Sequence, residues 1–336
     1  MVHMLTRRFL LSTAALGLAS RALAQDAVVP LRLALIAPRA GDDYFVGCRE
    51  GALQAAAEVA GAQLSFMAPP EEDSARQAAL VDDMVAQRYD AILISPIPSD
   101  VVIAACEKAI AAGLRVISFD TPLPPGARHL HLRTPDVADA APALLQAMNA
   151  ALGKSGEVAL LSTARERADH QAFVKALQHE WLKPDYESLI LITTVFGQSN
   201  VHVAYAEALA IVQAYPNLRG IIAPDAPALM GAARAVQDLG RTQSIKLTGV
   251  GLPSRLAGLV RNGEVPTFIT WSPVDVGYAA ARIALSILRN EEAILADAPL
   301  RAGRLGELVV DKGGVAKVAE LITVDAASID KYDDLF

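Results

Sequence analysis

The sequence contains little cysteine and no excess of basic residues, and each shortage argues against a broad class of protein. Only two of its 336 residues are cysteines, and 30 Lys and Arg stand against 37 Asp and Glu, giving a net charge of −7. A nucleic-acid partner requires clustered basic side chains, which this balance argues against. A small disulfide scaffold requires many more cysteines. We expect Cys48 and Cys106, both in helix-like stretches, to be buried and unpaired.

Motifs of common enzyme classes are missing as well. Neither Gly-x-Ser-x-Gly nor Gly-x-x-x-x-Gly-Lys-[Ser/Thr] occurs. The Gly-Lys-Ser at residues 153–155 lacks the upstream glycine of a phosphate loop, and the Gly-Val-Gly at 249–251 lacks the third glycine of a dinucleotide site. His129 and His131 point to the same side of a strand, but without a third matched ligand we expect an ordinary surface pair. The sequence thus predicts no enzyme, no metal and no cofactor.

The first residues have the composition of an export signal. Arg7 and Arg8 precede an apolar run at residues 9–19, and the Ala-Leu-Ala at 22–24 has the form of a cleavage site. The run is shorter than the roughly 20 residues that span a bilayer, and the paired arginines are also compatible with twin-arginine export. We therefore predict a periplasmic protein whose signal, residues 1–24, is cleaved.

Apolar strand-like runs alternate with helix-like stretches along the rest of the chain. The expected strands are residues 31–38, 63–67, 91–95, 115–119, 129–132, 157–161, 189–195, 221–222, 246–250 and 267–271. The expected helices are residues 44–61, 74–88, 100–112, 135–152, 169–181, 199–215, 228–239, 253–262 and 274–289. Such alternation predicts an α/β fold in which helices cover both faces of parallel sheets.

The alternation runs through two half-chains of similar rhythm, which predicts two doubly wound, Rossmann-like lobes with a ligand cleft between them. The length after the signal is sufficient for two domains of roughly 100–200 residues. We assign residues 28–133 and 272–299 to an N-terminal lobe, and residues 134–271 and 300–336 to a C-terminal lobe. The tail after Leu300 shows the weakest pattern.

Residues 220–231 join a strand end, a carboxylate and the start of a helix. A short apolar run ends in Pro224, Asp225 and Ala226, and a helix of small residues follows at once. Ligands of doubly wound sheets bind outside the carboxyl ends of the strands. Asp225 is therefore a candidate ligand-binding residue.

Two strand ends in the first half carry groups that suit a polyhydroxylated ligand. The loop after the first strand contains Arg39, Asp42, Asp43, Tyr44 and Phe45, which supply a cation, two carboxylates and two aromatic rings. Asp120 directly follows the strand at 115–119. The alternatives are a solvated loop whose aromatics fill the core, and a turn-forming aspartate before Thr-Pro.

The second half of the chain repeats this arrangement. Asp169 and His170 open the helix after the strand at 157–161, and Trp271 closes the strand at 267–271. Taken alone, Asp169 is better explained as a helix N-cap, and Trp271 is either a stacking wall or core filler. Several strand ends carry such groups at one topological edge, and this convergence favours a ligand site.

Several segments match a known pattern: residues 194–197 (Thr-Val-Phe-Gly), 214–218 (Ala-Tyr-Pro-Asn-Leu), 221–226 and 329–333. In these the chain resembles the periplasmic sugar-binding proteins of ribose-type importers, most closely the autoinducer-2-binding and rhamnose-binding branch. The Cys-Arg-Glu-Gly at 48–51 after Tyr44 and Phe45 is more like the rhamnose side. The resemblance covers essentially the whole mature chain, and implies two lobes joined by three crossings that close on a ligand.

The resemblance implies roles for individual residues. Asp120 and Asp169 match carboxylates that hydrogen-bond ligand hydroxyls, Pro224 and Ala226 match positions that contact autoinducer-2 through the backbone, and Trp271 matches an aromatic wall. The predicted ligand-binding set is Arg39, Asp43, Tyr44, Phe45, Asp120, Asp169, His170, Phe196, Pro224, Asp225, Ala226 and Trp271.

Three positions depart from the autoinducer-2 pattern. Arg39 stands near the place of a binding lysine, and the two differ in hydrogen-bond geometry. His170 stands where those proteins carry glutamine, and Gly251 where many ribose-type proteins carry aspartate. These departures argue against autoinducer-2 as the ligand. They do not affect the broader prediction of a small hydroxylated ligand.

The resemblance implies a monomeric solute-binding subunit that delivers its ligand to the membrane permease of an ATP-binding-cassette (ABC) importer and has no nucleic-acid partner. One alternative is a periplasmic protein that reports its ligand to a chemoreceptor or sensor kinase. Another is a sugar-responsive transcription regulator, which would need a DNA-binding helix-turn-helix where this chain has its export signal.

Overall fold

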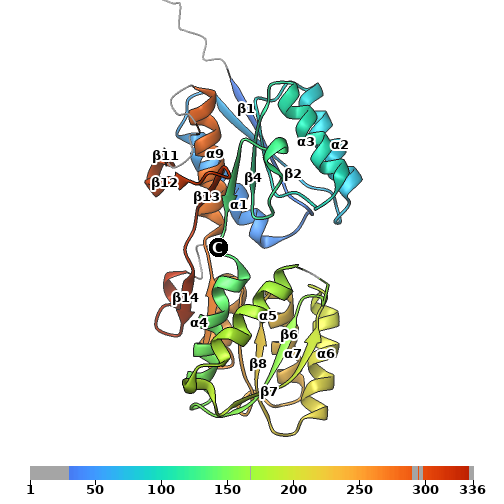
Figure 1. Ribbon diagram of the computed structural model, residues 1–336, viewed down its shortest axis with the longest axis vertical. Helices are drawn as coiled ribbons and strands as arrows, with labels where there is room; N and C mark the ends of the chain where they lie inside the picture. The colour runs from blue at the N-terminus through green and yellow to red at the C-terminus, as the bar shows by residue number, and fades with distance from the viewer. Residues whose placement is uncertain (1–29, 167, 290–293, 295–297, 333–336) are drawn as a thin grey trace, which may run out of the picture.

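The computed structural model describes residues 30–166, 168–289, 294 and 298–332. They form two lobes, one above the other along the long axis of the molecule (Figure 1). The predicted signal peptide lies outside the described residues. No helix in the described ranges is both long and apolar enough to cross a membrane.

The first lobe is built on an eight-stranded sheet in the order β11-β12-β13-β5-β4-β3-β1-β2. Its elements are β1 (Leu31–Ile36), α1 (Asp43–Ala57), β2 (Ala62–Met67), α2 (Ser74–Ala86), β3 (Ala91–Ile94), α3 (Asp100–Ala111), β4 (Arg115–Phe119), η1 (Pro125–Ala127), β5 (Leu130–Arg133), α9 (Pro273–Leu288), β11 (Ala298–Arg301), η3 (Gly303–Leu305), β12 (Glu307–Val310) and β13 (Val315–Lys317). Strands β1 to β5 pair in parallel.

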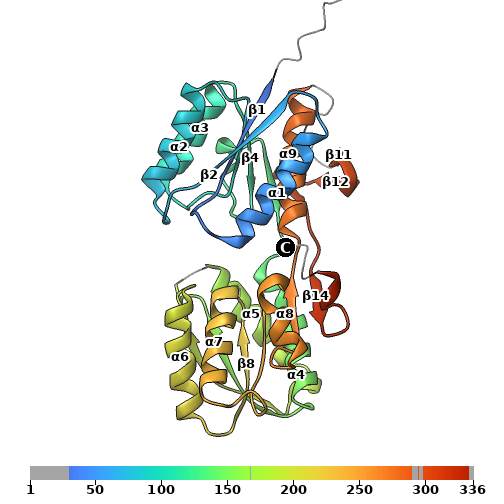
Figure 2. The same cartoon turned by 180° about the vertical axis from the view of Figure 1, so that it is seen from behind.

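Alternate residues of β1 point to opposite faces of this sheet, and helices bury both faces. Leu33 and Leu35 pack in the core under α1 and α9, whereas Ala34 and Ile36 pack in the core under α2 and α3. Figure 2 shows the same layers from behind. A strand that is buried on both faces needs apolar residues throughout, which explains the continuous apolar run.

Helices α1 and α9 come into backbone contact because each has a glycine at the crossing. A Cβ added at Gly51 would overlap the carbonyl of Val274, and one added at Gly277 would overlap the carbonyl of Cys48. This close approach ties the first helix of the chain to the helix that returns from the second lobe.

The second lobe contains a four-stranded parallel sheet in the order β7-β6-β8-β9. A bridge between Val250 and Ile269 extends it to β10, which pairs with β14 in antiparallel fashion. The elements are α4 (Val137–Ala151), β6 (Gly156–Ser162), α5 (Ala168–Trp181), η2 (Pro184–Tyr186), β7 (Leu189–Phe196), α6 (Val201–Ala214), β8 (Leu218–Ala223), α7 (Ala226–Asp238), β9 (Lys246–Gly249), α8 (Pro253–Arg261), β10 (Thr267–Thr270), β14 (Ile322–Asp325) and η4 (Ile329–Lys331).

The five parallel strands of each lobe follow the same spatial order. It reads β2-β1-β3-β4-β5 in the first lobe and β7-β6-β8-β9-β10 in the second. The chain crosses between the lobes before α4, between β10 and α9, and between β13 and β14. The predicted α/β class with two doubly wound lobes is confirmed.

The tail corrects the predicted lobe boundaries. We had assigned residues 300–336 to the second lobe, but β13 pairs with β5, and β11 and β12 extend the first sheet beyond it. Only β14 and η4 pack on the second lobe. Most residues of strands β11 to β14 are exposed or half-buried, so they lack the continuous apolar run that makes a four-residue strand such as β3 predictable, which is why the assignment failed.

Two side-chain predictions have definite outcomes. Cys48 and Cys106 are free and buried, as expected. The expected surface pair of histidines is wrong for His131, which is only 4% exposed and shares a hydrogen bond of 3.0 Å with Ser118 Oγ. The strand β13 pairs with β5 in parallel, so β5 lies inside the sheet and not at its edge, and the prediction missed β13.

Candidate functional site

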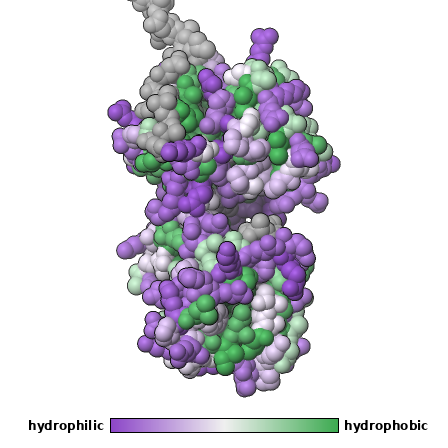
Figure 3. Space-filling view, in the orientation of Figure 1, coloured by the Kyte–Doolittle hydropathy of each residue, from purple (hydrophilic) through white to green (hydrophobic). Residues whose placement is uncertain are grey.

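The carboxyl edges of the two sheets lie opposite one another, and the interlobe cleft runs between them. Figure 3 shows the molecule hollowed between the lobes, with mostly hydrophilic residues on either side. In doubly wound folds this edge is where ligands bind.

The loop after β1 places Arg39 and Asp42 beside the start of α1. Asp42 caps the helix by accepting from the backbone N–H of Tyr44 at 3.0 Å. Its other carboxylate oxygen accepts from Arg39 Nη2 at 3.0 Å. Arg39 keeps about 42% of its side chain exposed, so it has donors available for a ligand. The sequence identified Asp42 as one of two carboxylates in this loop but not as the cap, although its position before the helix is typical of one.

Three aromatic rings meet where α1, β10 and the second crossing come together. Tyr44 lies edge-on to both Phe45 and Trp271, with ring centroids 5.1 and 6.3 Å apart. Trp271 Nε1 donates to the Tyr44 hydroxyl at 3.3 Å. Phe45 is 6% exposed and packs toward Phe119, which makes it part of the core behind this cluster. Tyr44 and Trp271 remain partly exposed, and they join the cores of the two lobes.

Asp120 occupies a strained position at the end of β4. Its φ of +59° lies in the left-handed region, which is uncommon for residues other than glycine and concentrates at functional sites. Its carboxylate accepts from Ser95 Oγ, at the end of β3, at 3.0 Å.

Asp120 also acts electrostatically on its neighbours. Burial is the main reason that the pKa values of Tyr44 and Cys48 are raised well above normal, and the negative charge of Asp120 raises both further. Tyr44 and the buried Cys48 therefore stay protonated, and the first-lobe edge presents the neutral hydroxyl of Tyr44 beside the carboxylate of Asp120.

In the second lobe, His170 forms a compact cluster with neighbouring strand ends. It is 8% exposed, and its Nδ1 shares a short hydrogen bond of 2.6 Å with Ser162 Oγ. Phe196, at the end of β7, lies edge-on to the imidazole at 5.1 Å, and the Arg165 guanidinium stands 4.8 Å from the Phe196 ring centroid. The structure thus brings the predicted His170 and Phe196 together, whereas Ser162 and Arg165 were missed.

Asp225 is anchored by its own helix. One carboxylate oxygen accepts from the N–H of Ala228 at 2.7 Å, as the N-cap of α7, and the other accepts from Ser199 Oγ at 2.9 Å. Pro224 is buried and Ala226 partly exposed. Asp169 lies in the first turn of α5, and its side chain is outside the described part of the structure.

Asp43 makes a contact that the sequence did not predict. Its carboxylate accepts from Nε and Nη2 of Arg255, the latter at 2.6 Å, and Arg255 belongs to α8 of the opposite lobe. The ligand-binding role that the sequence predicts for Asp43 stays a prediction. In the structure its carboxylate forms an ion pair between the lobes.

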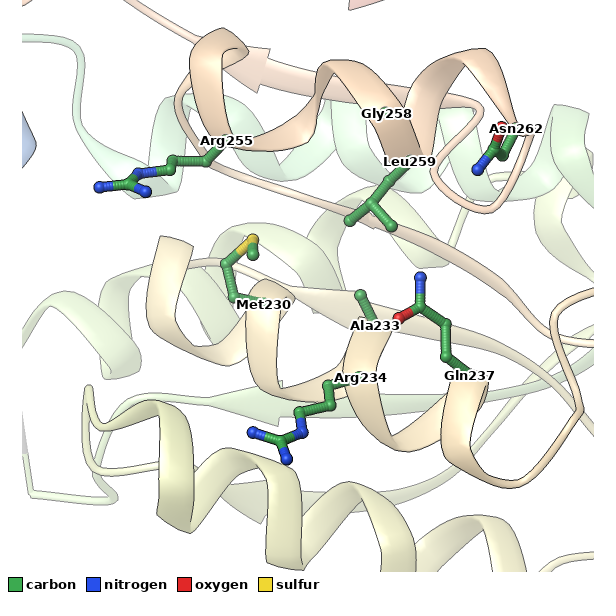
Figure 4. A pocket seen from close by; sticks show the side chains of 8 residues that line it. All are labelled: Met230, Ala233, Arg234, Gln237, Arg255, Gly258, Leu259 and Asn262. Atoms are coloured by element: carbon green, nitrogen blue, oxygen red, sulfur yellow. The ribbon is translucent and has the colours of Figure 1, made fainter.

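A second hollow lies away from this edge, between α7 and α8. It has a volume of about 320 Å³, and Figure 4 shows Met230, Arg234, Gln237, Leu259 and Asn262 among its lining residues. None of the predicted ligand-binding residues lines it; the arginine at its end is Arg255, which pairs with Asp43.

Comparison with known proteins agrees with this geometry. Residues 33–292 match the family model described as a periplasmic binding protein domain. A D-apiose import binding protein of Actinobacillus succinogenes is 24% identical over 213 residues, which cover 63% of this chain and 67% of that protein.

Solved structures share the whole fold. A solute-binding protein of Clostridium phytofermentas with bound L-rhamnose superposes with a TM-score of 0.78 at 24% identity, covering 92% of this chain and 99% of that one. LsrB of Clostridium saccharobutylicum, in complex with AI-2, also has a TM-score of 0.78, at 18% identity, covering 90% of this chain and 100% of the other. The family model spans most of the chain, so this chain belongs to the periplasmic binding protein family.

Proposed function

We propose that this chain is the exported solute-binding subunit of an ABC importer and that its ligand is a small sugar held between the lobes. The observation that carries this proposal is the pairing of two opposed sheet edges, each with carboxylate, hydroxyl and aromatic groups. The relative from A. succinogenes is named for the import of a sugar, which supports the same class.

Each edge supplies groups that suit a different part of a sugar. Asp120 would accept hydrogen bonds from ring hydroxyls, and the partly exposed Arg39 would donate to ring or hydroxyl oxygens. Trp271 and Tyr44 would cover the apolar face of the ring. His170, Phe196 and the backbone at Pro224 and Ala226 would meet the ligand from the second lobe, together with Asp169 and Asp225.

The chain would act by closing around its ligand and presenting the closed form to a membrane permease. Hinge closure suits this molecule because, in the described part of the chain, the two lobes are linked covalently by three crossings. The proposal includes a cleaved N-terminal signal, a periplasmic location, a monomeric subunit and no catalytic step.

A ligand screen tests the proposal. Thermal unfolding would be measured with D-ribose, D-allose, D-apiose, L-rhamnose and AI-2, followed by calorimetric titration of every compound that raises the melting temperature. A ligand at 100 times its Kd stabilises a protein by about 2.7 kcal/mol, which is easily detected. A sugar response that Asp120→Ala removes supports the proposal. A response to AI-2 alone would replace the sugar with the furanosyl signal, and no response at all would reject the function.

A further inference from the structure

Gln77 is a fully buried amide on the face of α2 that packs on the first sheet. The buried residues of α2 are Gln77, Val81 and Met84, which recur at the spacing of one helix face. The other two are apolar and contact the core. A polar side chain at 0% exposure on such a face needs hydrogen-bond partners.

All three of its hydrogen bonds go to backbone groups at the cleft edge. Nε2 donates to the carbonyl of Ala37 at 3.1 Å and to that of Ser95 at 2.9 Å, while Oε1 accepts from the N–H of Ile97 at 2.7 Å. Ala37 follows β1, and Ser95 and Ile97 follow β3. One amide therefore holds together the loops that leave two neighbouring strands.

Both loops lead directly to proposed ligand-binding groups. Only Pro38 separates Ala37 from Arg39 along the chain. Ser95, whose carbonyl accepts from Gln77, donates its hydroxyl to Asp120 at 3.0 Å. Gln77 and Ser95 thus form a relay, defined as two successive hydrogen bonds: Gln77 on α2 donates to Ser95, and Ser95 donates to the Asp120 carboxylate after β4. Ser95 is 1% exposed, so it is held as firmly as Gln77.

We infer that Gln77 is a positioning residue: through Ser95 it sets where Asp120 and the Arg39 loop stand relative to each other, and so tunes affinity for a sugar it does not touch. This inference rests on the proposed function for its ligand, while its geometric part concerns the free protein. A placement error of an ångström in a binding group weakens its hydrogen bonds steeply.

Three variants and a control separate positioning from plain stabilisation. Gln77→Met keeps the bulk of the side chain and removes all three hydrogen bonds. Gln77→Glu retains an acceptor for Ile97 and loses the donors to both carbonyls when ionised. Ser95→Ala removes only the hydrogen bond from the Ser95 hydroxyl to Asp120. Met84→Ala, on the same helix face, removes core packing and leaves in place the hydrogen bonds from Gln77 to the strand ends.

The first readout needs no ligand. Amide hydrogen exchange of the free protein, corrected for global stability, should accelerate in Gln77→Met at Ile97 and in the segments around Arg39 and Asp120. Met84→Ala should leave those segments at the wild-type rate. Unchanged exchange around Asp120 in Gln77→Met would overturn the positioning role, whether or not any sugar binds.

The second readout is the Kd for D-ribose, D-allose, D-apiose or L-rhamnose, whichever binds the wild type. We expect Gln77→Met to lose about 10-fold or more, equivalent to roughly 1.4 kcal/mol, with Gln77→Glu in between and Ser95→Ala losing affinity at nearly wild-type melting temperature. Wild-type affinity in Gln77→Met, or an equal loss in Met84→Ala, overturns the inference. If Gln77→Met does not fold, Ser95→Ala decides. If the wild type binds none of these sugars, the sugar part of the proposed function fails and the exchange result alone decides the inference.

Discussion

Each lobe ends one strand in an aspartate that accepts from a serine hydroxyl, yet the two aspartates serve different purposes. Asp225 also caps α7, so both of its oxygens are engaged in local structure. Asp120 precedes no helix, and its backbone adopts a left-handed conformation at φ +59°. A similar pair of residues therefore builds a helix start in one lobe and presents a carboxylate at a strained turn in the other.

A second contrast lies between the fourth and fifth parallel strands of each lobe. Between β4 and β5 the first lobe buries a hydrogen bond shared by Ser118 Oγ and His131 Nδ1. At the equivalent place the second lobe has Thr248 Oγ1 donating to the carbonyl of Thr267 at 2.7 Å. The first bond involves a titratable imidazole and the second does not. The shared strand order thus fixes where polar groups meet, while the residue types decide what they can do.

The largest effect should come from replacing each aspartate in turn. We expect Asp120→Ala to weaken sugar binding about 100-fold, because a charge-assisted hydrogen bond contributes roughly 1.5–3 kcal/mol. Asp225→Ala should cost about 1 kcal/mol of folding stability through loss of the cap and weaken binding far less. Calorimetry and denaturant unfolding of both variants measure this. Equal losses of affinity would show that the two carboxylates are equivalent.

The buried histidine should make stability depend on pH. Burial, then the positive charge of Arg128, lowers the pKa of His131 to about 4 from 6.5. A base with a lowered folded pKa is neutral in the native state, so its contribution is full above pH 6.5 and is lost as the pH falls toward 4. The loss should reach roughly 2–3 kcal/mol.

Unfolding by denaturant between pH 7 and pH 4 measures this dependence. His131→Asn keeps a hydrogen-bonding group beside Ser118 and should flatten the profile. His129, whose pKa burial also lowers, contributes in the same direction. The exposed His202 is the control for substitution. A His131→Asn profile as steep as the wild type would contradict the assignment.

A smaller effect should follow from changing His170, which stands at the second-lobe edge. His170→Gln removes the edge-on contact with Phe196, and aromatic contacts of this kind contribute about 0.5–1.5 kcal/mol. We expect sugar affinity to fall up to about 10-fold, and the ratio of AI-2 to sugar affinity to rise. His179→Gln, on the exposed face of the same helix, serves as the matched control. An unchanged ratio would show that His170 does not set selectivity.

The smallest effect concerns the ion pair that joins the lobes. Asp43 and Arg255 are 44% and 61% exposed, and exposed pairs contribute at most about 1 kcal/mol. A double-mutant cycle with Asp43→Asn and Arg255→Gln, read through ligand affinity, should give a coupling below that value that disappears in about 1 M salt. A larger, salt-resistant coupling would mean that the pair is buried when the cleft closes.

Most of the fold was readable from the sequence because its central strands are continuously apolar and its helices are long. Capped helices such as α2 begin where predicted. The strands β11 to β14 could not be predicted, since most of their residues are exposed or half-buried and they lack the continuous apolar run of a strand such as β3. At the site, strand-end positions identified Asp120, His170 and Trp271. The ion pair of Asp43 depends on the approach of a distant helix, and the relay through Gln77 appears in sequence only as a polar residue on an apolar face.

The pairing of β13 with β5 has a consequence for how the molecule can be divided. Residues 315–317 complete the first sheet, and Val324 and Ile329 complete the core of the second lobe. Neither lobe is whole until the residues from 315 to 329 are present, and contacts that distant in sequence form slowly. The two lobes are separate in space, but no single cut of the chain would yield one complete lobe on each side of the cut. An isolated lobe would have to be assembled by joining segments that the natural chain keeps apart.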